Sequence, residues 1–406
     1  IRDWEEWLRA THPDHEATAE ARYYLAVILA GTPGEERASL EILRDVAAGG
    51  GERSADALWR IAWIERRLGA DAAARSALDR LLEAQTGAGY RTAALYWRAR
   101  FAAPAERDRA IELYRAVRRE APRDYYARAA EDRLRELGQE PSALVADGAA
   151  LPAPDSLADL GRRPEPAYGR GVELAALGLP RLAAAELATL DLAADPALAL
   201  GIAHLHHRGG DTWSAIGLLL EHFADELAGL PLDAPGVAPE VWETLYPFPY
   251  EPTVRSGIRS ANLVPPGVPI DPWLVATVAR RESRFWRHAA SPAGAVGVLQ
   301  LMPETAARVA RQVGMAPPDR PALFDAETNL ALGTAELARL IAAFDGEWAP
   351  ALAAYNAGEA AAREWWQARP PGQPLDEWIE NIPYTETRLY VKWILGTYPI
   401  YRHLHR

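Results

Sequence analysis

The chain has 406 residues, of which 49% are apolar, so two or three domains with sizeable cores are expected. Its net charge of −12 disfavours nucleic-acid binding, because contacts with phosphate groups dominate the affinity of such complexes. Cysteine is absent, which excludes disulfide bonds, thiol catalysis and thiolate metal sites.

The chain begins at Ile1 rather than at methionine, and no basic stretch followed by an apolar one opens it. A signal peptide is therefore not visible. We expect a processed or trimmed form, from which any export signal or lipid anchor has been removed. No stretch of about 18 uncharged apolar residues occurs, so no transmembrane segment is expected either.

Residues 1–140 are expected to form helices of about 12–15 residues, because apolar residues recur at spacings of three and four. Weak internal similarity accompanies this pattern. The aromatic pair Tyr23-Tyr24 recurs as Trp59 and then as Trp97, at spacings of 35 and 38 residues. Such periods are typical of helix pairs that stack into a superhelix. The alternative is that Trp and Tyr fill the core of an ordinary helical domain.

Two proline-rich stretches divide the rest of the chain. The first, at 141–166, indicates a linker or long loop, and the second covers about 230–270. Between them a helical pattern extends from Tyr168 to Phe223. The expected domains are a helical superhelix at 1–165, a further helical or linker domain at 166–250, and a last domain at 251–406.

Three histidines of the middle segment, His204, His206 and His207, raise the question of a metal site. On one helix, this spacing without a nearby carboxylate is a weak metal signature. Surface or packing roles are favoured, and no metal is expected.

A single glutamate is the first candidate for chemistry. Asp271 followed by Pro272 predicts a helix start, with a side-chain cap and a proline in the first turn. On that helix Val275, Val278, Glu282 and Phe285 share one face, so Glu282 is the only charge on an apolar stripe. Burial would raise its pKa, as a general acid near neutral pH requires. The alternative is a solvated glutamate at the rim of the stripe, or one paired with the neighbouring Arg281.

Three later segments add polar residues at loops and helix ends. The first is an apolar loop, 291–303, with Ser291, Gln300 and Met302. The alternative without a function is a tight connection between two helices, with a methionine that packs in the core. The second, 353–358, places Tyr355 and Asn356 before Gly358, a suitable helix C-cap. The third, 381–391, places Glu386 in the first turn of a helix, where it could be a helix-start charge or a partner of Arg388.

Together the four segments resemble the catalytic domain of the family 1 soluble lytic transglycosylases, the SLT domain. The upstream two thirds resembles the large members of that family, through Trp59, Trp97 and Trp242. These members carry a helical superhelix, closed into a ring, and a linker domain before the catalytic one. The blocks that carry the resemblance are Glu282-Ser283, Gly294-Ala295, Gln300-Leu301-Met302-Pro303, Ala354-Tyr355-Asn356-Ala357-Gly358, Ile382-Pro383-Tyr384 and Glu386-Thr387-Arg388.

The resemblance implies an all-α fold, with a ring- or horseshoe-like superhelix of helical repeats followed by a lysozyme-like α catalytic domain. It implies that Glu282 is the only catalytic residue. Glu386 would stabilise charge or hold a substrate N-acetyl group, and Tyr355 would orient Glu282. The residues expected to line the sugar-binding groove are Ser291, Gln300, Met302, Tyr355, Asn356 and Glu386. The pair Val298-Leu299 stands where the family usually has Leu-Met, which should alter packing but not chemistry.

The implied reaction cleaves peptidoglycan between N-acetylmuramic acid and N-acetylglucosamine and leaves a 1,6-anhydromuramic end, with Glu282 as acid and then base. It needs no cofactor. The expected partners are glycan strands rather than nucleic acid, the expected state is a monomer, and the substrate implies a periplasmic or cell-envelope location. Two alternatives remain open: a hydrolase of lysozyme type, and a helical scaffold that binds glycan without cutting it.

Overall fold

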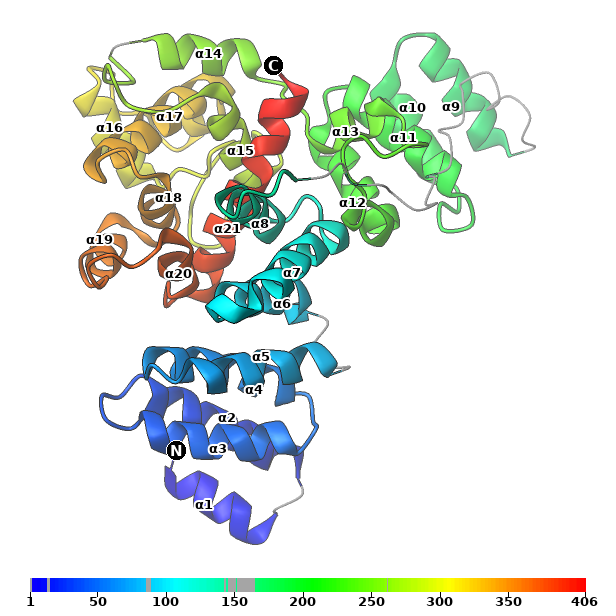
Figure 1. Ribbon diagram of the computed structural model, residues 1–406. Helices are drawn as coiled ribbons and strands as arrows, with labels where there is room; N and C mark the ends of the chain where they lie inside the picture. Colours follow the sequence, from blue (N-terminus) through cyan, green and yellow to red (C-terminus); the bar gives the residue numbers. More distant parts are fainter. Residues whose placement is uncertain are drawn as a thin grey trace. The chain divides into compact units, whose positions relative to one another are not determined.

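The computed structural model, drawn in Figure 1, describes residues 2–12, 15–84, 89–141, 144, 151, 165–260 and 262–406. Within these ranges the regular structure is helical, and extended pairing is limited to isolated bridges of Val296 with Ala290 and Leu301. The expected all-α fold class is thereby confirmed. None of the helices in the described ranges combines the length and the apolar character that crossing a membrane would require.

The chain divides into two compact units. The first comprises Ile1–Pro122 and Tyr126–Leu144, and the second Arg123–Tyr125 and Val145–Arg406. The domain borders expected near 165 and 250 stay predictions. The proline-rich linker expected at 141–166 lies largely outside the described residues.

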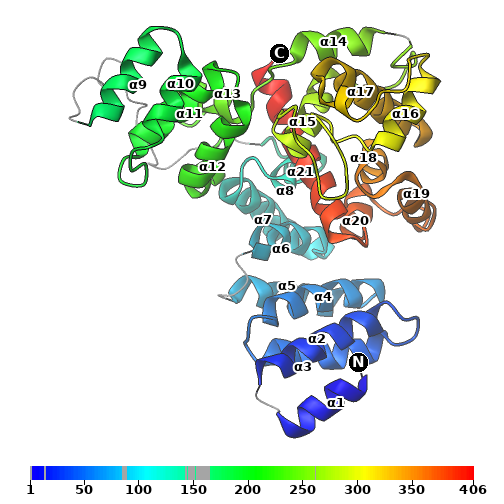
Figure 2. The ribbon, with the colours of Figure 1, turned by 180° about the vertical axis from the view of Figure 1, so that it is seen from behind.

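Consecutive helices of the first unit pack against each other. Contacts join consecutive α-helices in the series that begins with α2 and ends with α7, and both Figure 1 and Figure 2 show these helices side by side in sequence order. The pairs α2–α3, α4–α5 and α6–α7 therefore form the expected helix-pair repeats. The helices are α1 (Arg2–Thr11), α2 (Glu16–Ala30), α3 (Glu36–Ala48), α4 (Ser54–Arg67), α5 (Asp71–Glu83), α6 (Arg91–Arg100), η2 (Pro104–Glu106), α7 (Arg107–Glu120) and α8 (Tyr125–Glu136).

Several of the recurring aromatic residues lie in the interior between these repeats, although Tyr24 is exposed and Trp59 is only partly buried. Trp97 and Tyr23 are buried, and the rings of Trp97 and Trp63 lie 4.8 Å apart in an edge-to-face contact. Trp59 contacts Trp63 in turn, at 6.0 Å between ring centroids. Large aromatic rings bury much apolar surface, so one ring per repeat gives each helix pair a share of a continuous core.

The second unit begins with a run of shorter helices, several of which have proline in their first turn, where its missing N–H costs nothing. His206, in α11, has its Nδ1 3.0 Å from Asp211 Oδ2, so this histidine does have the carboxylate neighbour that we did not expect. In the part of the chain that the structure describes, no three His, Asp or Glu side chains are grouped to hold a metal. The helices are α9 (Pro166–Ala176), α10 (Pro180–Leu187), α11 (Pro196–Arg208), α12 (Thr212–Ala228), α13 (Pro239–Leu245) and α14 (Glu251–Arg259).

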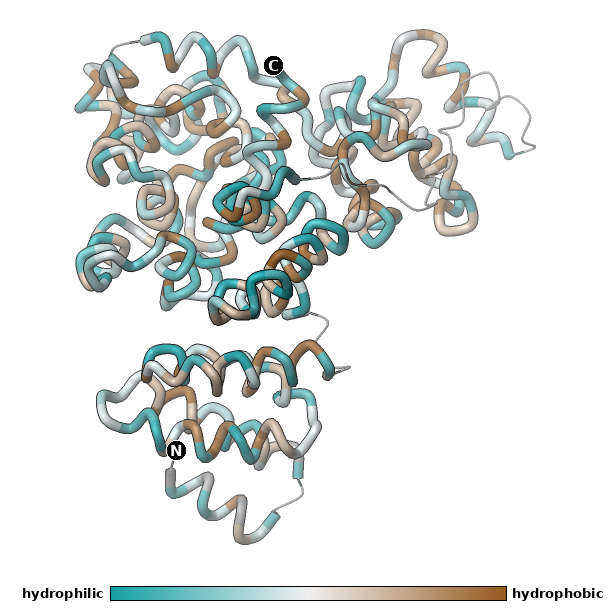
Figure 3. Tube along the Cα trace, viewed as in Figure 1, coloured by the Kyte–Doolittle hydropathy of each residue, from teal (hydrophilic) through white to brown (hydrophobic). Residues whose placement is uncertain are grey.

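The remaining helices include α15, whose residues Leu274, Val275 and Val278 are fully buried in a core shared with α17, α18 and α21. The long α21 packs along α15, and α18 contacts both α17 and α21. Figure 3 shows hydrophobic and hydrophilic residues alternating along these helices, as expected where one face points to a core. The helices are α15 (Pro272–Ser283), α16 (Pro303–Gln312), η4 (Pro321–Phe324), α17 (Ala326–Ala343), α18 (Trp348–Ala357), α19 (Glu359–Gln367), α20 (Leu375–Glu380) and α21 (Thr385–Leu404).

Candidate active site

Helix α15 carries Glu282 in its last turn. Its start is as predicted: the Asp271 side chain accepts a hydrogen bond from the Leu274 N–H at 2.9 Å, and Pro272 opens the helix. Its end differs from the prediction, because the helix stops at Ser283 and Phe285 therefore lies beyond the apolar stripe on which we placed it. Phe285 is nevertheless buried, with 3% of its surface exposed.

The two residues after this helix adopt a backbone conformation that is unfavourable for them. Arg284 has φ 51° and Phe285 has φ 64°, which lie in the left-handed region that residues with a Cβ atom rarely occupy. Such conformations persist only where the surroundings enforce them. The Arg284 carbonyl accepts a hydrogen bond from the Thr212 hydroxyl at 2.9 Å, which fixes this turn against α12.

The Glu282 carboxyl lies against α21 and is only partly exposed. The Tyr390 hydroxyl, from a side chain that is 3% exposed, donates a hydrogen bond to Glu282 Oε1 at 2.6 Å. Burial raises the pKa of Glu282 to about 7, although the Tyr390 hydrogen bond and the charge of Arg281 act in the opposite direction, and the charge of Glu386 adds to the rise. A carboxyl with this pKa can donate a proton near neutral pH.

The alternative of an ion pair between Glu282 and Arg281 is not observed within the described ranges. The Arg281 guanidinium lies instead over the ring of Trp393, with its Cζ 5.6 Å from the ring centroid. Glu282 thus keeps a neutral hydrogen-bond donor, Tyr390, as its direct partner.

The loop that faces the end of α15 is held by a buried asparagine. Asn329, fully buried in α17, accepts a hydrogen bond from the Leu299 N–H at 2.8 Å and donates to the Val296 carbonyl at 2.9 Å. Gly297 has φ 82°, and a Cβ there would lie 2.2 Å from Asn329 Nδ2. The glycine is therefore required both by its conformation and by the asparagine. The Ser283 hydroxyl adds a hydrogen bond to the Val298 carbonyl at 2.7 Å.

Tyr355 lies near Glu282, but its hydroxyl forms its hydrogen bond with another residue. Its hydroxyl donates to the Leu299 carbonyl at 2.7 Å, and its pKa is raised well above the usual value by burial and by the nearby Glu282 charge. We expected Tyr355 to orient the carboxyl, and in the structure the direct contact comes from Tyr390. Tyr390 lies in the 381–391 segment, but no sequence pattern connected it with Glu282, because 108 positions separate the two residues.

Three of the predicted groove residues belong to the loop between α15 and α16. Gln300 has φ 45°, and its Nε2 donates to the carbonyls of Gly297 at 2.8 Å and Ala289 at 3.2 Å. The Ser291 hydroxyl accepts a hydrogen bond from the Ala295 N–H at 3.0 Å. These polar groups thus shape the loop. Met302 precedes α16 and leaves 42% of its surface exposed.

The last two predicted residues lie at the junction of α18 and α21. The Asn356 Oδ1 accepts a hydrogen bond from the Thr387 hydroxyl at 2.6 Å, which joins the two helices. Glu386 is exposed in the first turn of α21. Arg388 donates to the Ile382 carbonyl at 2.8 Å and not to Glu386, so the suggested pair of Glu386 and Arg388 is not found.

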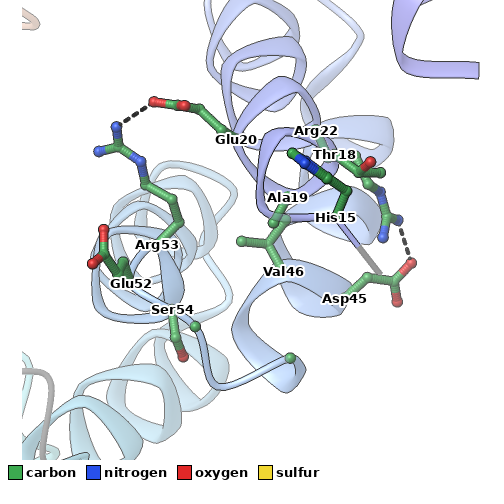
Figure 4. A pocket seen from close by; sticks show the side chains of 12 residues that line it. His15, Thr18, Ala19, Glu20, Arg22, Asp45, Val46, Glu52, Arg53 and Ser54 are labelled. Atoms are coloured by element: carbon green, nitrogen blue, oxygen red, sulfur yellow. Dashed lines mark hydrogen bonds and ion pairs between the residues drawn. The ribbon is translucent and has the colours of Figure 1, made fainter. Parts of the chain in front are cut away.

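A different cavity lies within the first unit, between α2, α3 and the start of α4 (Figure 4). It has a volume of about 610 Å³. Arg53 pairs with Glu20 at 2.8 Å and Arg22 pairs with Asp45 at 2.7 Å, as the dashed lines of Figure 4 mark. Its lining therefore lacks a buried carboxyl without a cationic partner, the feature that distinguishes Glu282.

Comparison with known proteins agrees with the resemblance stated from the sequence. Residues 268–373 match the sequence model of the Transglycosylase SLT domain, and this range contains Glu282, the loop to Met302 and the Tyr355 segment. The soluble lytic murein transglycosylase of Salmonella typhimurium is 35% identical over 127 residues, which are 31% of this chain and 20% of that protein. The resemblance to the SLT domain is confirmed for this part of the chain.

Solved structures extend the likeness to the fold of the whole chain. The lytic transglycosylase Slt of Pseudomonas aeruginosa, solved as an inactive mutant, has a TM-score of 0.64 at 23% identity and covers 90% of this chain. The 70 kDa soluble lytic transglycosylase of Escherichia coli has a TM-score of 0.67 at 23% identity and covers 99%. The expected combination of helical superhelix and lysozyme-like α domain is thereby confirmed. The chain spans 57% and 59% of the length of these two neighbours.

Proposed function

We propose that this protein is a peptidoglycan lytic transglycosylase that cleaves the bond between N-acetylmuramic acid and N-acetylglucosamine and leaves a 1,6-anhydromuramic end. The observation that carries the proposal is Glu282, a carboxyl with a pKa of about 7 that has a tyrosine and no cation as its direct partner, in a region that matches the SLT domain. The activity of the whole chain is part of the proposal, because the aligned segment spans only 20% of the Salmonella typhimurium protein.

In the first step Glu282 acts as the general acid. Its proton passes to the oxygen that joins the two sugars, and the bond between this oxygen and the anomeric carbon breaks. Most glycosidases use a second carboxylate at this point, whereas substrate-assisted enzymes are an exception. The N-acetyl group of the substrate would stabilise the positive charge that develops on the anomeric carbon.

In the second step the ionised Glu282 acts as the general base. It takes the proton from the 6-hydroxyl of the muramic acid, and this oxygen forms a new bond with the anomeric carbon. Glu282 ends protonated again, with a proton from the 6-hydroxyl in place of the one it gave to the leaving oxygen, and neither water nor a cofactor enters the balance. An attacking group in the same sugar gains from proximity, which lowers the entropic part of the barrier.

The groove residues would divide into two kinds. Met302 and Glu386 leave side-chain surface exposed, which supports direct contact with sugars. Glu386 would stabilise charge or bind an N-acetyl group. Gln300, Ser291 and Asn356 use polar atoms to hold loops and helix ends, so they would shape the groove as well as line it. Tyr355 would do the same through the Leu299 carbonyl.

A hydrolase of lysozyme type is the second candidate, because the same acid could serve a reaction in which water attacks. The products differ: hydrolysis leaves a reducing sugar, and the transglycosylase product is lighter by one water. Digestion of purified peptidoglycan followed by mass spectrometry separates the two, with Glu282→Gln as the control. Binding of glycan without any product would favour a non-catalytic scaffold. The proposed substrate would imply a location in the periplasm or cell envelope.

A further inference from the structure

The turn that follows Glu282 also lines a second cavity of the same unit, with a volume of about 390 Å³. The walls come from the start of α10, the first turn of α12 and residues 285–288. None of the predicted groove residues lines this cavity. Its volume lies in the range of small-molecule sites in proteins.

Two tryptophans of this cavity are unusually exposed. Trp213 leaves 48% of its surface accessible and Trp286 leaves 47%, and their ring centroids lie 5.9 Å apart at an interplanar angle of 44°. Tryptophan is mostly buried in folded proteins, so two exposed rings that line one cavity are suited to contact with a ligand. The electron-rich face of an indole ring suits the polarised C–H groups on one face of a sugar ring.

Two exposed arginines of the same cavity, Arg181 and Arg287, form no ion pair with any residue in the described ranges, unlike Arg170, which pairs with Glu186. The Arg287 Nε donates a hydrogen bond to His288 Nε2 at 3.0 Å, and its charge helps to lower the pKa of Asp325. The acid of the cavity, Asp211, is already engaged by the Ser214 N–H and by His206. The cavity therefore offers cationic donors that favour carboxylates, because guanidinium groups bind carboxylates in pairs of hydrogen bonds.

The turn that carries Trp286 continues directly from α15, the helix that carries Glu282. Arg284 and Phe285 hold their left-handed conformations through the Thr212 hydroxyl and through burial of the Phe285 ring. The Arg284 guanidinium lies over the Trp213 ring, 6.0 Å from its centroid. Trp286 follows directly, four positions after Glu282 in the chain.

We propose that this cavity is a second peptidoglycan-binding site, which takes an amino-sugar ring against Trp213 and Trp286 and the carboxylates of its peptide stem on Arg181 and Arg287. The inference rests on the proposed function, because that function supplies the ligand. Stacking rings with arginine would also suit single-stranded nucleic acid, but the net charge of −12 opposes that ligand.

Binding is measured on the full chain carrying Glu282→Gln, so that the ligand is not cut. The probes are soluble glycan strands with peptide stems and the same strands after the stems are removed. Trp213→Ala with Trp286→Ala should weaken binding of both probes about tenfold. Arg181→Ala with Arg287→Ala should weaken binding of the peptide-bearing strands by a similar factor and leave the peptide-free strands unaffected.

Matched controls are available outside the cavity. Trp4→Ala removes another exposed tryptophan and Arg259→Ala another exposed arginine, and both should bind like the parent. Thermal unfolding confirms that each variant folds. Unchanged binding in both double variants overturns the second site, as does equal or tighter binding of a single-stranded oligonucleotide that the same changes weaken.

The two proposals fail in different ways. If the chain with Glu282 intact yields anhydro product while the cavity variants bind normally, the second site is wrong and the activity stands. If no product forms but the cavity variants lose binding, the activity is wrong and the site stands.

Discussion

Two glutamates, one in each unit, show how opposite surroundings give the same side chain opposite chemistry. Glu106 of the helical repeats accepts a hydrogen bond from the buried Arg98 at 2.6 Å, which lowers its pKa to about 2. Glu282 is raised to about 7 by burial, with only the Tyr390 hydroxyl as its direct partner. In the repeats, Glu106 forms an ion pair with Arg98 that favours its ionised form. At the end of α15, Glu282 has no cation as its direct partner. The presence of that cation decides the role.

The largest expected effect is on turnover. Glu282→Gln removes the proton donor and should lower the turnover number about a thousandfold, a typical contribution of general acid–base catalysis. The rate of anhydro-product formation is followed by mass spectrometry. Glu106→Gln is the matched control, and its turnover per folded molecule should equal that of the parent. Normal turnover of Glu282→Gln would show that the contrast between the two glutamates has no catalytic meaning.

The same substitution should stabilise the protein at alkaline pH. From about pH 4.5 to 7 the folded chain keeps a proton on Glu282 that the unfolded chain releases, so stability falls as pH rises. A shift from 4.5 to about 7 corresponds to about 3 kcal/mol in the free energy of unfolding. Urea unfolding at pH 5 and pH 8 measures this. The free energy of unfolding of Glu282→Gln, relative to that of the parent, should be larger at pH 8 than at pH 5. The same difference at both pH values would contradict the raised pKa.

Glu106 should behave in the opposite sense. Its pKa is lowered by Arg98, so its stabilising contribution is present above about pH 4.5 and is lost as pH falls towards 2. Glu106→Gln should therefore cost about 1–2 kcal/mol at pH 7, less than the pKa shift alone implies because the side chain is 27% exposed. Thermal unfolding of Glu106→Gln and the parent across this pH range tests whether the stability cost decreases as the pH falls. A cost that grows as the solution becomes more acidic would exclude the ion pair as its source.

The smallest effect concerns the tyrosine that contacts Glu282. Tyr390→Phe removes a hydrogen bond that favours the ionised carboxylate, so the pKa of Glu282 should rise and the alkaline limb of the pH–rate profile should move upward. Turnover should fall about tenfold, because the carboxyl is less well oriented. Tyr355→Phe, which loses a bond to the Leu299 carbonyl instead, serves as the comparison. An unmoved profile in Tyr390→Phe would exclude this tyrosine from the proton-transfer step.

Local rules explain which parts of the site could be predicted from the sequence. The start of α15 at Asp271-Pro272 and the cap at Gly358 depend on neighbouring residues, and both are found as expected. The helix-pair repeats follow from periodic apolar residues in the same way. A helical period also placed Phe285 on α15, and this was wrong because the turn is held by Thr212, 72 positions away.

Contacts between distant residues explain what was missed. Tyr390 reaches Glu282 from α21, and Asn329 holds the loop of Leu299 from 30 positions away. Neither residue belongs to a local pattern, since a tyrosine on a long amphipathic helix and an asparagine in an apolar one occur in many folds. Only the core that α15 shares with α17 and α21 gives these two residues their roles.

The most direct test of the contrast is to titrate the two glutamates in one sample. Carbon-13 labelling of the glutamate carboxyl groups, with each signal assigned by its loss in Glu282→Gln and Glu106→Gln, reports both ionisations by NMR. We expect the Glu282 signal to titrate with a midpoint near pH 7 and the Glu106 signal with one near pH 2. A midpoint near 4.5 for Glu282 would contradict its proposed role as the acid of the reaction.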